Sequence, residues 1–272
     1  MSRVTTSRIA NRFSELRANH AKGLIVYMTA GDPSLDATGE LLPALDRAGV
    51  DVIELGVPFS DPLADGPVIQ RASERALRSG TTLRQILSRF PVWRQSVRAP
   101  IILFSYFNPL LRYGLEKFTR DAAQAGIDGA LVVDLSPEEA EGYVESMRAQ
   151  ELDTVFLASP TSTNARLQRA AQLSTGFLYL ISRTGVTGER SEMASSVGAL
   201  AGRARALTSL PLAVGFGIST PAQVREVQSH ADAAVVGSAV VHAIEEHYSR
   251  QGAAFIERLV RTLKTGREDQ PA

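Results

Sequence analysis

Three carboxylates fall within twelve residues in the stretch "ELGVPFSDPLADGP", residues 54–67. Glu54 lies inside an apolar run, and Asp61 and Asp65 follow it in a segment rich in proline and glycine. A glutamate among apolar neighbours has a raised pKa, which suits proton transfer near neutral pH. A buried carboxylate is costly without a partner, so Glu54 is predicted to be functional rather than half of a buried ion pair. For Asp61 and Asp65 a turn role is an equal alternative, because Asp before Pro or Gly caps its own backbone.

Glycine-rich segments later in the chain predict a phosphate site. They are "SRTGVTG" (182–188), "GFGIS" (215–219) and "GSAV" (237–240), and each follows an apolar run. Glycines let backbone N–H groups approach an anion closely, and a helix that begins at the third segment adds its dipole. Asp134, in "VVDLSPEE", is instead predicted to cap the helix that follows it.

The residue types that are missing narrow the chemistry. No lysine or histidine stands at the end of an apolar run, so neither a Schiff base nor a His-ligated metal is expected there. The lysines and histidines of the chain, all of which lie elsewhere, are Lys22, Lys117, Lys264, His20, His230, His242 and His247. The absence of cysteine excludes disulfides and thiolate nucleophiles and fits a cytoplasmic protein. Carbon or proton chemistry run by carboxylates on a phosphorylated small molecule remains.

Charge and hydropathy exclude other classes of protein. The 29 basic and 29 acidic residues cancel, which gives no electrostatic case for a nucleic-acid or anionic-membrane partner. No apolar run approaches the roughly 18 residues of a membrane span. Residues 1–20 are Arg- and Ser-rich like a transit peptide, but Ile9, Phe13 and Leu16 share one helical face and Ser7 suits an N-cap. A helix is the favoured interpretation.

Eight apolar runs must position these residues, and they begin near residues 23, 50, 100, 127, 153, 176, 211 and 231. Their apolar residues are continuous, as in strands buried on both faces, and helical patterns separate them. This alternation predicts a single (β/α)8 TIM barrel over residues 1–272, with an extra helix at residues 1–20. A doubly wound sheet is the alternative, but no dinucleotide-binding glycine motif follows the first run. Residues 59–80 and 184–200 are predicted to be active-site loops, because the connections there are long.

The motifs "ELGVPFSDPLADGPVIQ", "SRTGVTG", "GFGIS" and "GSAVV" appear in order, and with them the chain resembles the tryptophan synthase alpha subunit family over nearly its whole length. The resemblance implies a lyase of L-tryptophan biosynthesis, which cleaves indole-3-glycerol phosphate reversibly to indole and glyceraldehyde 3-phosphate by a retro-aldol reaction. It implies that Glu54 is the general acid/base at the indole carbon, and that Asp65 accepts the indole N–H. Tyr179 would lie near the glycerol hydroxyls.

Further positions follow from the same resemblance. The implied phosphate contacts are Gly188, Phe216, Gly217, Gly237 and Ser238, with Ser219 nearby. The implied indole pocket contains Tyr27, Phe104, Leu131 and Ile69, for which a plain core role is the alternative. Coupling to a partner is implied for Pro58, Asp61, Gly185, Thr187 and Arg183.

The implied partner is a beta subunit in an alpha2-beta2 complex. The resemblance places pyridoxal phosphate in that subunit only, and no metal in this chain. A free-standing lyase and a non-catalytic barrel that only activates a partner are the alternatives. Retention of both Glu54 and Asp65 argues against the second.

Overall fold

The computed structural model describes residues 7–181, 190–215 and 217–267, and within them eight parallel strands close into a barrel. Each strand pairs with the next along the chain, and the last pairs with the first. The strands are β1 (Gly23–Thr29), β2 (Val52–Gly56), β3 (Ile101–Ser105), β4 (Gly129–Val132), β5 (Asp153–Ala158), β6 (Leu178–Ile181), β7 (Leu212–Gly215) and β8 (Ala233–Val236). The predicted (β/α)8 barrel is confirmed.

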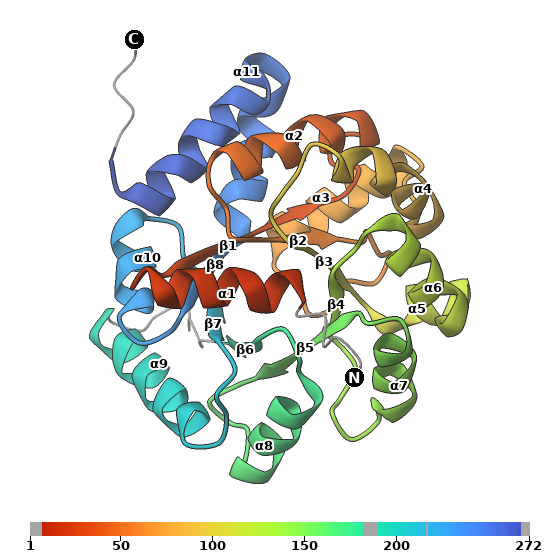
Figure 1. The fold of residues 1–272 in the computed structure, drawn as a ribbon. Helices are drawn as coiled ribbons and strands as arrows, with labels where there is room; N and C mark the ends of the chain where they lie inside the picture. Colours follow the sequence, from red (N-terminus) through yellow and green to blue (C-terminus); the bar gives the residue numbers. More distant parts are fainter. Residues whose placement is uncertain (1–6, 182–189, 216, 268–272) are drawn as a thin grey trace.

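Helices form an outer layer around the strands (Figure 1). They are α1 (Arg8–Ala18), α2 (Leu35–Arg47), α3 (Pro67–Arg78), α4 (Leu83–Arg94), α5 (Phe107–Tyr113), α6 (Leu115–Ala125), α7 (Glu141–Ala149), α8 (Asn164–Leu173), α9 (Arg190–Arg205), α10 (Pro221–Gln228) and α11 (Ser238–Thr265). One large apolar cluster fills the space between this layer and the strands.

A second apolar cluster fills the barrel interior, and it fixes which way β2 faces. Val52 belongs to the interior cluster, whereas Ile53 and Leu55 pack outward beneath the helices. Because successive strand residues point to opposite faces, Glu54 shares the inward face with Val52. The apolar run "VIELG" therefore carries its single carboxylate into the barrel.

Helix α1 closes the end of the barrel at which the strands begin (Figure 1). Its buried residues Ile9, Phe13 and Leu16 belong to the interior cluster, and the rings of Phe13 and Phe177 lie 5.9 Å apart. The Ser7 hydroxyl accepts the Ala10 N–H at 3.1 Å and caps the helix. The predicted extra helix is thus confirmed over residues 8–18 of the predicted 1–20.

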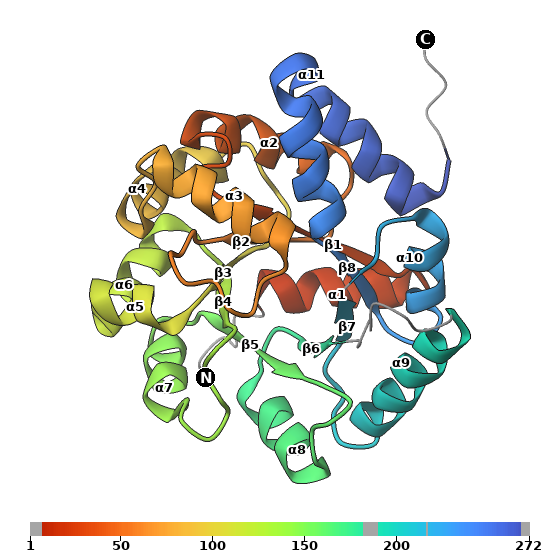
Figure 2. The same cartoon turned by 180° about the vertical axis from the view of Figure 1, so that it is seen from behind.

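Each of the two predicted active-site loops includes part of a helix. Residues 67–78 of the first form α3, which begins with a proline at its first turn and buries Ala72 and Ala76 at helical spacing. Proline suits that position because the first helical N–H has no partner within the helix. The second stretch overlaps α9 from Arg190 onward. Figure 2 looks onto the end of the barrel where α3 and the first turns of α11 lie beside β1.

Candidate active site

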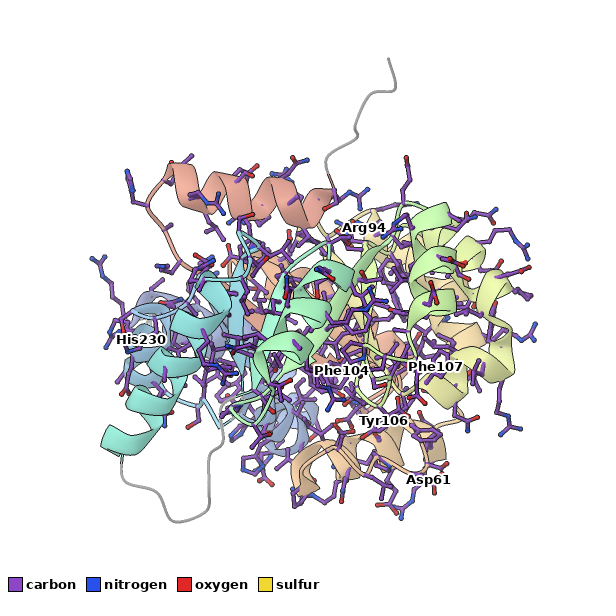
Figure 3. The ribbon with its side chains drawn as sticks, turned by 90° about the horizontal axis from the view of Figure 1, so that it is seen from below. Asp61, Arg94, Phe104, Tyr106, Phe107 and His230 are labelled. Carbon is purple, nitrogen blue, oxygen red and sulfur yellow. The ribbon has the colours of Figure 1, made fainter. Side chains whose placement is uncertain are left out.

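Polar residues gather where the strands end, opposite α1. Figure 3 shows α1 at one end of the molecule and Tyr106 and Asp61 at the other. Glu54 comes from β2, Asp65 from the loop after it, and Tyr106 from the end of β3. Because the carboxyl ends of parallel strands meet at one rim of a barrel, residues distant in sequence come together there.

Glu54 is the most deeply buried of these acids, with 1% of its surface exposed. In the strand register it lies beside Tyr27 on one side and Ile102 on the other. Its Oε1 has no hydrogen-bond partner among the described residues. Burial without a neighbouring cation raises the Glu54 pKa from 4.5 to about 8. Glu54 is therefore a carboxylic acid near neutral pH, able to give a proton and take it back.

Asp65 lies in the loop between β2 and α3 and is half-buried. Its backbone N–H donates to the Pro62 carbonyl at 3.0 Å, and its own carbonyl accepts the Gln70 side-chain amide at 2.8 Å. Burial raises the Asp65 pKa to about 6, and the nearby Tyr106 hydroxyl opposes that rise. Asp65 thus stays mostly ionised at neutral pH. The sequence reasoning missed Tyr106, although its place directly after β3 was a usable signal.

Aromatic and apolar side chains gather around Tyr27, the neighbour of Glu54 in the strand register. The rings of Tyr27 and Phe104 meet edge to face with centroids 5.1 Å apart, and Ile69 of α3 packs in the same small cluster. Leu131 and Tyr179 belong to the interior cluster, and Phe104 packs against that cluster too, beside Leu131 in the strand register. Phe104 therefore links Tyr27 and Ile69 to the interior cluster that holds Leu131 and Tyr179. The end of the barrel where the strands end is called the mouth below.

Two glycines make room for the tyrosines of this mouth. A Cβ on Gly56 would collide with the Tyr27 hydroxyl, and a Cβ on Gly215 with the Tyr179 hydroxyl. Burial raises the pKa of both tyrosines, and the Glu54 carboxylate adds to each shift. Both hydroxyls are therefore protonated at neutral pH and can donate hydrogen bonds. Neither glycine had been singled out in the sequence for this reason.

The predicted phosphate segments end the last two strands. Gly217 is exposed, with a φ of +73° that favours glycine, and the hydroxyl of exposed Ser219 donates to Gln223 at 3.1 Å. Gly237 and Ser238 form the start of α11, and a Cβ on Gly237 would lie 3.4 Å from the Tyr27 side chain. The start of α11 thus adjoins the mouth. Gly188 and Phe216 lie outside the described residues.

The predicted coupling residues divide into two groups. Pro58 is buried, whereas Asp61 is exposed and accepts the Ser60 hydroxyl at 2.5 Å. Arg183, Gly185 and Thr187 lie outside the described residues.

Asp134 does not cap the helix that follows it, which corrects the prediction. Its Oδ1 accepts the Phe107 N–H at 2.7 Å, at the first residue of α5, and α7 instead begins after Ala140. The physical reason is that Asp134 follows β4, whose neighbour β3 leads directly into α5. The carboxylate reaches the adjacent helix start before the chain reaches its own next helix.

An ion-pair network braces the rim from outside. Arg75 of α3 donates two hydrogen bonds to the Asp32 carboxylate, at 2.7 and 2.8 Å, and a third to Glu245 of α11 at 2.6 Å. Asp32, in the loop after β1, is only 2% exposed. This network joins α3, α11 and the end of β1, and its members lie too far apart in sequence to have been paired beforehand.

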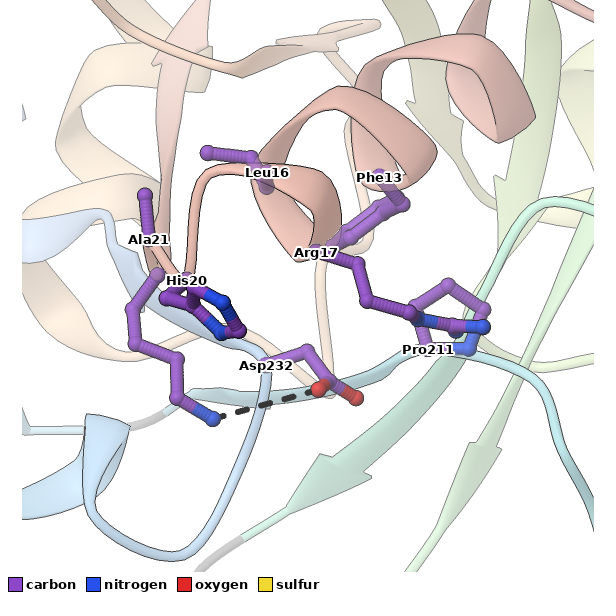
Figure 4. A pocket seen from close by; sticks show the side chains of 8 residues that line it. Phe13, Leu16, Arg17, His20, Ala21, Pro211 and Asp232 are labelled. Atoms are coloured by element: carbon purple, nitrogen blue, oxygen red, sulfur yellow. Dashed lines mark ion pairs between the residues drawn. The ribbon is translucent and has the colours of Figure 1, made fainter.

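A separate cavity of about 240 Å³ lies at the opposite end of the barrel, beside α1 (Figure 4). Phe13, Leu16 and His20 line it, and Lys22 and Asp232 form an ion pair across it at 3.9 Å. These residues stand at or before the starts of strands, away from Glu54 and Asp65.

Among the described residues, no helix is long and apolar enough to cross a bilayer.

Comparison with known proteins agrees with the geometry. The family model described as tryptophan synthase alpha chain matches residues 13–267. The tryptophan synthase alpha chain of Solibacter usitatus is 54% identical over 96% of this chain and 98% of its own length. That of Pelobacter propionicus is 45% identical over 95% and 97%.

Solved structures are similar in the same way. A chain of tryptophan synthase from M. tuberculosis, in an aminoacrylate-bound form, superposes with a TM-score of 0.86 at 36% identity, covering 96% of this chain and 99% of that one. The alpha subunit from Legionella pneumophila gives the same TM-score, identity and coverage. With its barrel, its motifs and these relatives, the chain belongs to the tryptophan synthase alpha chain family.

Proposed function

We propose that Glu54 and Asp65 carry the reaction of this family in this chain. The protein is a lyase of tryptophan biosynthesis, and its reaction is the aldol-type cleavage of indole-3-glycerol phosphate to indole and glyceraldehyde 3-phosphate. The observation that carries the assignment is the inward-facing Glu54, buried, protonated near neutral pH and without a partner for Oε1 among the described residues. A carboxyl group whose pKa is raised by burial to near the working pH is suited to be a proton donor.

During the proposed reaction Glu54 donates one proton and later regains one, and Asp65 accepts the indole N–H. Protonated Glu54 gives its proton to the indole ring carbon that bears the glycerol chain. The ring then carries positive charge at nitrogen, and the Asp65 carboxylate accepts the N–H and stabilises that charge. The bond from the ring to the hydroxyl-bearing carbon breaks, and its electron pair returns to the ring. The hydroxyl proton passes to the Glu54 carboxylate, which leaves an aldehyde and restores the acid.

The mouth suits the two halves of this substrate. Tyr27, Phe104, Ile69 and Leu131 provide an apolar surface for the indole, and the Tyr179 hydroxyl is a donor for the glycerol chain. The phosphate would bind at Gly217, Gly237 and Ser238, where backbone N–H groups and the positive end of α11 favour an anion. Ser219, Gly188 and Phe216 are proposed to complete this site. Phosphate binding here does not require a cationic side chain, because the backbone N–H groups of a helix N-terminus bind phosphate directly.

A beta subunit is the partner of this chain, and an alpha2-beta2 complex is the proposed assembly. Pyridoxal phosphate is assigned to the beta subunit. The lysines of this chain do not fit a Schiff base at the mouth: Lys22 donates to Ala231 before β8, Lys117 pairs with Asp121 on α6, and Lys264 pairs with Asp51. Exposed Asp61, with Pro58 and the residues Arg183, Gly185 and Thr187, is proposed to couple the two sites. The cytoplasm is the proposed location, in keeping with a chain that has no cysteine.

Indole release from indole-3-glycerol phosphate tests the proposal. The purified chain is assayed alone and with a beta subunit, as wild type, as Glu54→Gln, and as Glu116→Gln, which alters an exposed carboxyl on α6. We expect Glu54→Gln to lower the rate by about 10²–10⁴-fold and Glu116→Gln to leave it unchanged. Wild-type activity in Glu54→Gln would refute the assignment. Fast cleavage that ignores the beta subunit would indicate a free-standing lyase instead.

A further inference from the structure

The Tyr106 hydroxyl joins the end of β3 to the loop that carries Asp65. Tyr106 directly follows β3 and is 5% exposed. Its hydroxyl oxygen accepts the Ala64 N–H at 2.9 Å, and the hydroxyl lies near enough to the Asp65 carboxylate to oppose the rise of its pKa. One hydroxyl therefore fixes the backbone of the loop directly beside Asp65.

The position of this hydroxyl is set by the barrel rather than by the loop. On one side of Tyr106, the Ser105 hydroxyl donates to the Tyr106 carbonyl at 2.9 Å. On the other side, the Phe107 N–H donates to Asp134 at 2.7 Å. The Tyr106 ring also lies against Phe59, with centroids 5.0 Å apart and planes 33° apart. A ring held at its backbone and on its face presents its oxygen at a fixed place.

We propose that Tyr106 is the positioning residue for Asp65: its hydroxyl accepts the Ala64 N–H, fixes the loop at the residue before Asp65, and so holds the nearby carboxylate at the mouth of the barrel for the indole N–H. The inference rests on the proposed role of Asp65 and adds to it the group that aims it. Tyr106 does not itself need to touch the substrate. The rigidity of β3 passes through this hydroxyl to an otherwise partly exposed loop.

The charges around Asp65 show why the hydroxyl matters. The titratable groups that face it are Tyr27 of β1 and Tyr106. Glu54 of β2 faces Tyr27, and Asp134 faces Tyr106 from beyond β4. All of these are neutral or acidic. Among the described residues, the Tyr106 hydroxyl is the group that favours the ionised carboxylate against burial. Its removal raises the Asp65 pKa above about 6, so less of the acceptor is ionised at neutral pH.

Tyr106→Phe in the full chain, assayed with a beta subunit, tests this. The variant keeps the ring against Phe59, and the Ala64 amide can turn to water because Ala64 is exposed. We expect kcat to fall about tenfold or more with little change in KM, because the phosphate and indole contacts remain. In a ¹³C NMR titration, the Asp65 carboxyl should shift its pKa upward by about one unit.

Two controls separate positioning from general damage. Tyr143→Phe removes another buried hydroxyl, which donates to the Ala130 carbonyl away from the mouth, and it should change neither kcat nor the Asp65 titration. Tyr106→Phe is also made in an Asp65→Asn background. If the hydroxyl acts through Asp65, its loss there should cost far less than tenfold, because the two changes are not independent.

Equal losses in the two backgrounds, or an Asp65 titration that does not move in Tyr106→Phe, would overturn the proposal. Failure of the underlying function gives a different result. In that case the wild type would release no indole, or Asp65→Asn would keep the wild-type rate.

Discussion

The buried Glu54 makes the fold less stable as pH rises, and Glu54→Gln should remove that dependence. The Glu54 pKa is about 8 in the folded chain and 4.5 in its ordinary state. Between these values the unfolded chain has lost this proton while the folded chain still holds it. The unfolded state therefore binds fewer protons, and the free energy of unfolding decreases with rising pH through this window. Below pH 4.5 both states are protonated, and the carboxyl carries no such penalty.

The size of the effect follows from the gap between the two pKa values. Each pH unit in the window is worth about 1.4 kcal/mol, so the whole gap corresponds to about 5 kcal/mol as an upper figure. From pH 5 to pH 8 we expect wild type to lose about 3–4 kcal/mol relative to Glu54→Gln. Glutamine is close in size and does not ionise, so the comparison isolates this proton. Asp65 and the other titrating groups occur in both proteins and cancel.

Urea unfolding at intervals from pH 5 to pH 9, on both proteins side by side, measures this difference. We expect the Glu54→Gln free energy of unfolding to gain on wild type steadily with pH and to level off above about pH 8. Glu116→Gln, at an exposed position, should run parallel to wild type. A difference that stays constant from pH 5 to pH 9 would mean that Glu54 ionises at its ordinary pH inside the barrel, and that burial does not raise its pKa.

Three more predictions concern residues around the site. Gly215→Ala should lower kcat/KM at least tenfold with a smaller loss of stability, since its Cβ must displace the Tyr179 hydroxyl; unchanged kinetics would show that this hydroxyl is not needed. Arg75→Met should lower the free energy of unfolding in urea by about 2–4 kcal/mol, because buried Asp32 loses both its hydrogen bonds to Arg75. A decrease of less than about 0.5 kcal/mol would mean that water replaces these bonds. Phe13→Ala should cost about 3–5 kcal/mol by opening the closed end of the barrel, while kcat at 25 °C stays near wild type; a large fall in kcat of the folded variant would contradict a purely structural role for α1.

The barrel was predictable because its strands are buried on both faces. Continuous apolar runs located them, and the single acid in β2 stood out against that background. The face to which Glu54 points also follows from the alternation along a strand. The stripe of Ile9, Phe13 and Leu16 likewise indicated a buried helix, but it did not indicate that this helix closes the barrel.

Other features depend on neighbours that local patterns do not reveal. Tyr106 bonds to Ala64, directly beside Asp65, because β2 and β3 are adjacent in space, although 42 positions separate Ala64 and Tyr106 in the chain. Asp134 caps α5 for the same reason, across β3 and β4. The start of α3 was hidden because the proline of its first turn also suits a loop. Pairing across strands was the information that the sequence patterns lacked.

The pH dependence of kcat/KM for indole formation tests the roles of Glu54 and Asp65 most directly. This quantity reports the pKa values of the free enzyme, so we expect it to rise as Asp65 ionises near pH 6 and to fall as Glu54 ionises near pH 8. The substrate phosphate also titrates near pH 6, and the limb that remains in Asp65→Asn identifies its share. A fall near pH 8 in wild type supports Glu54 as the acid. A wild-type kcat/KM that stays level through pH 9.5 would show that Glu54 is not the proton donor.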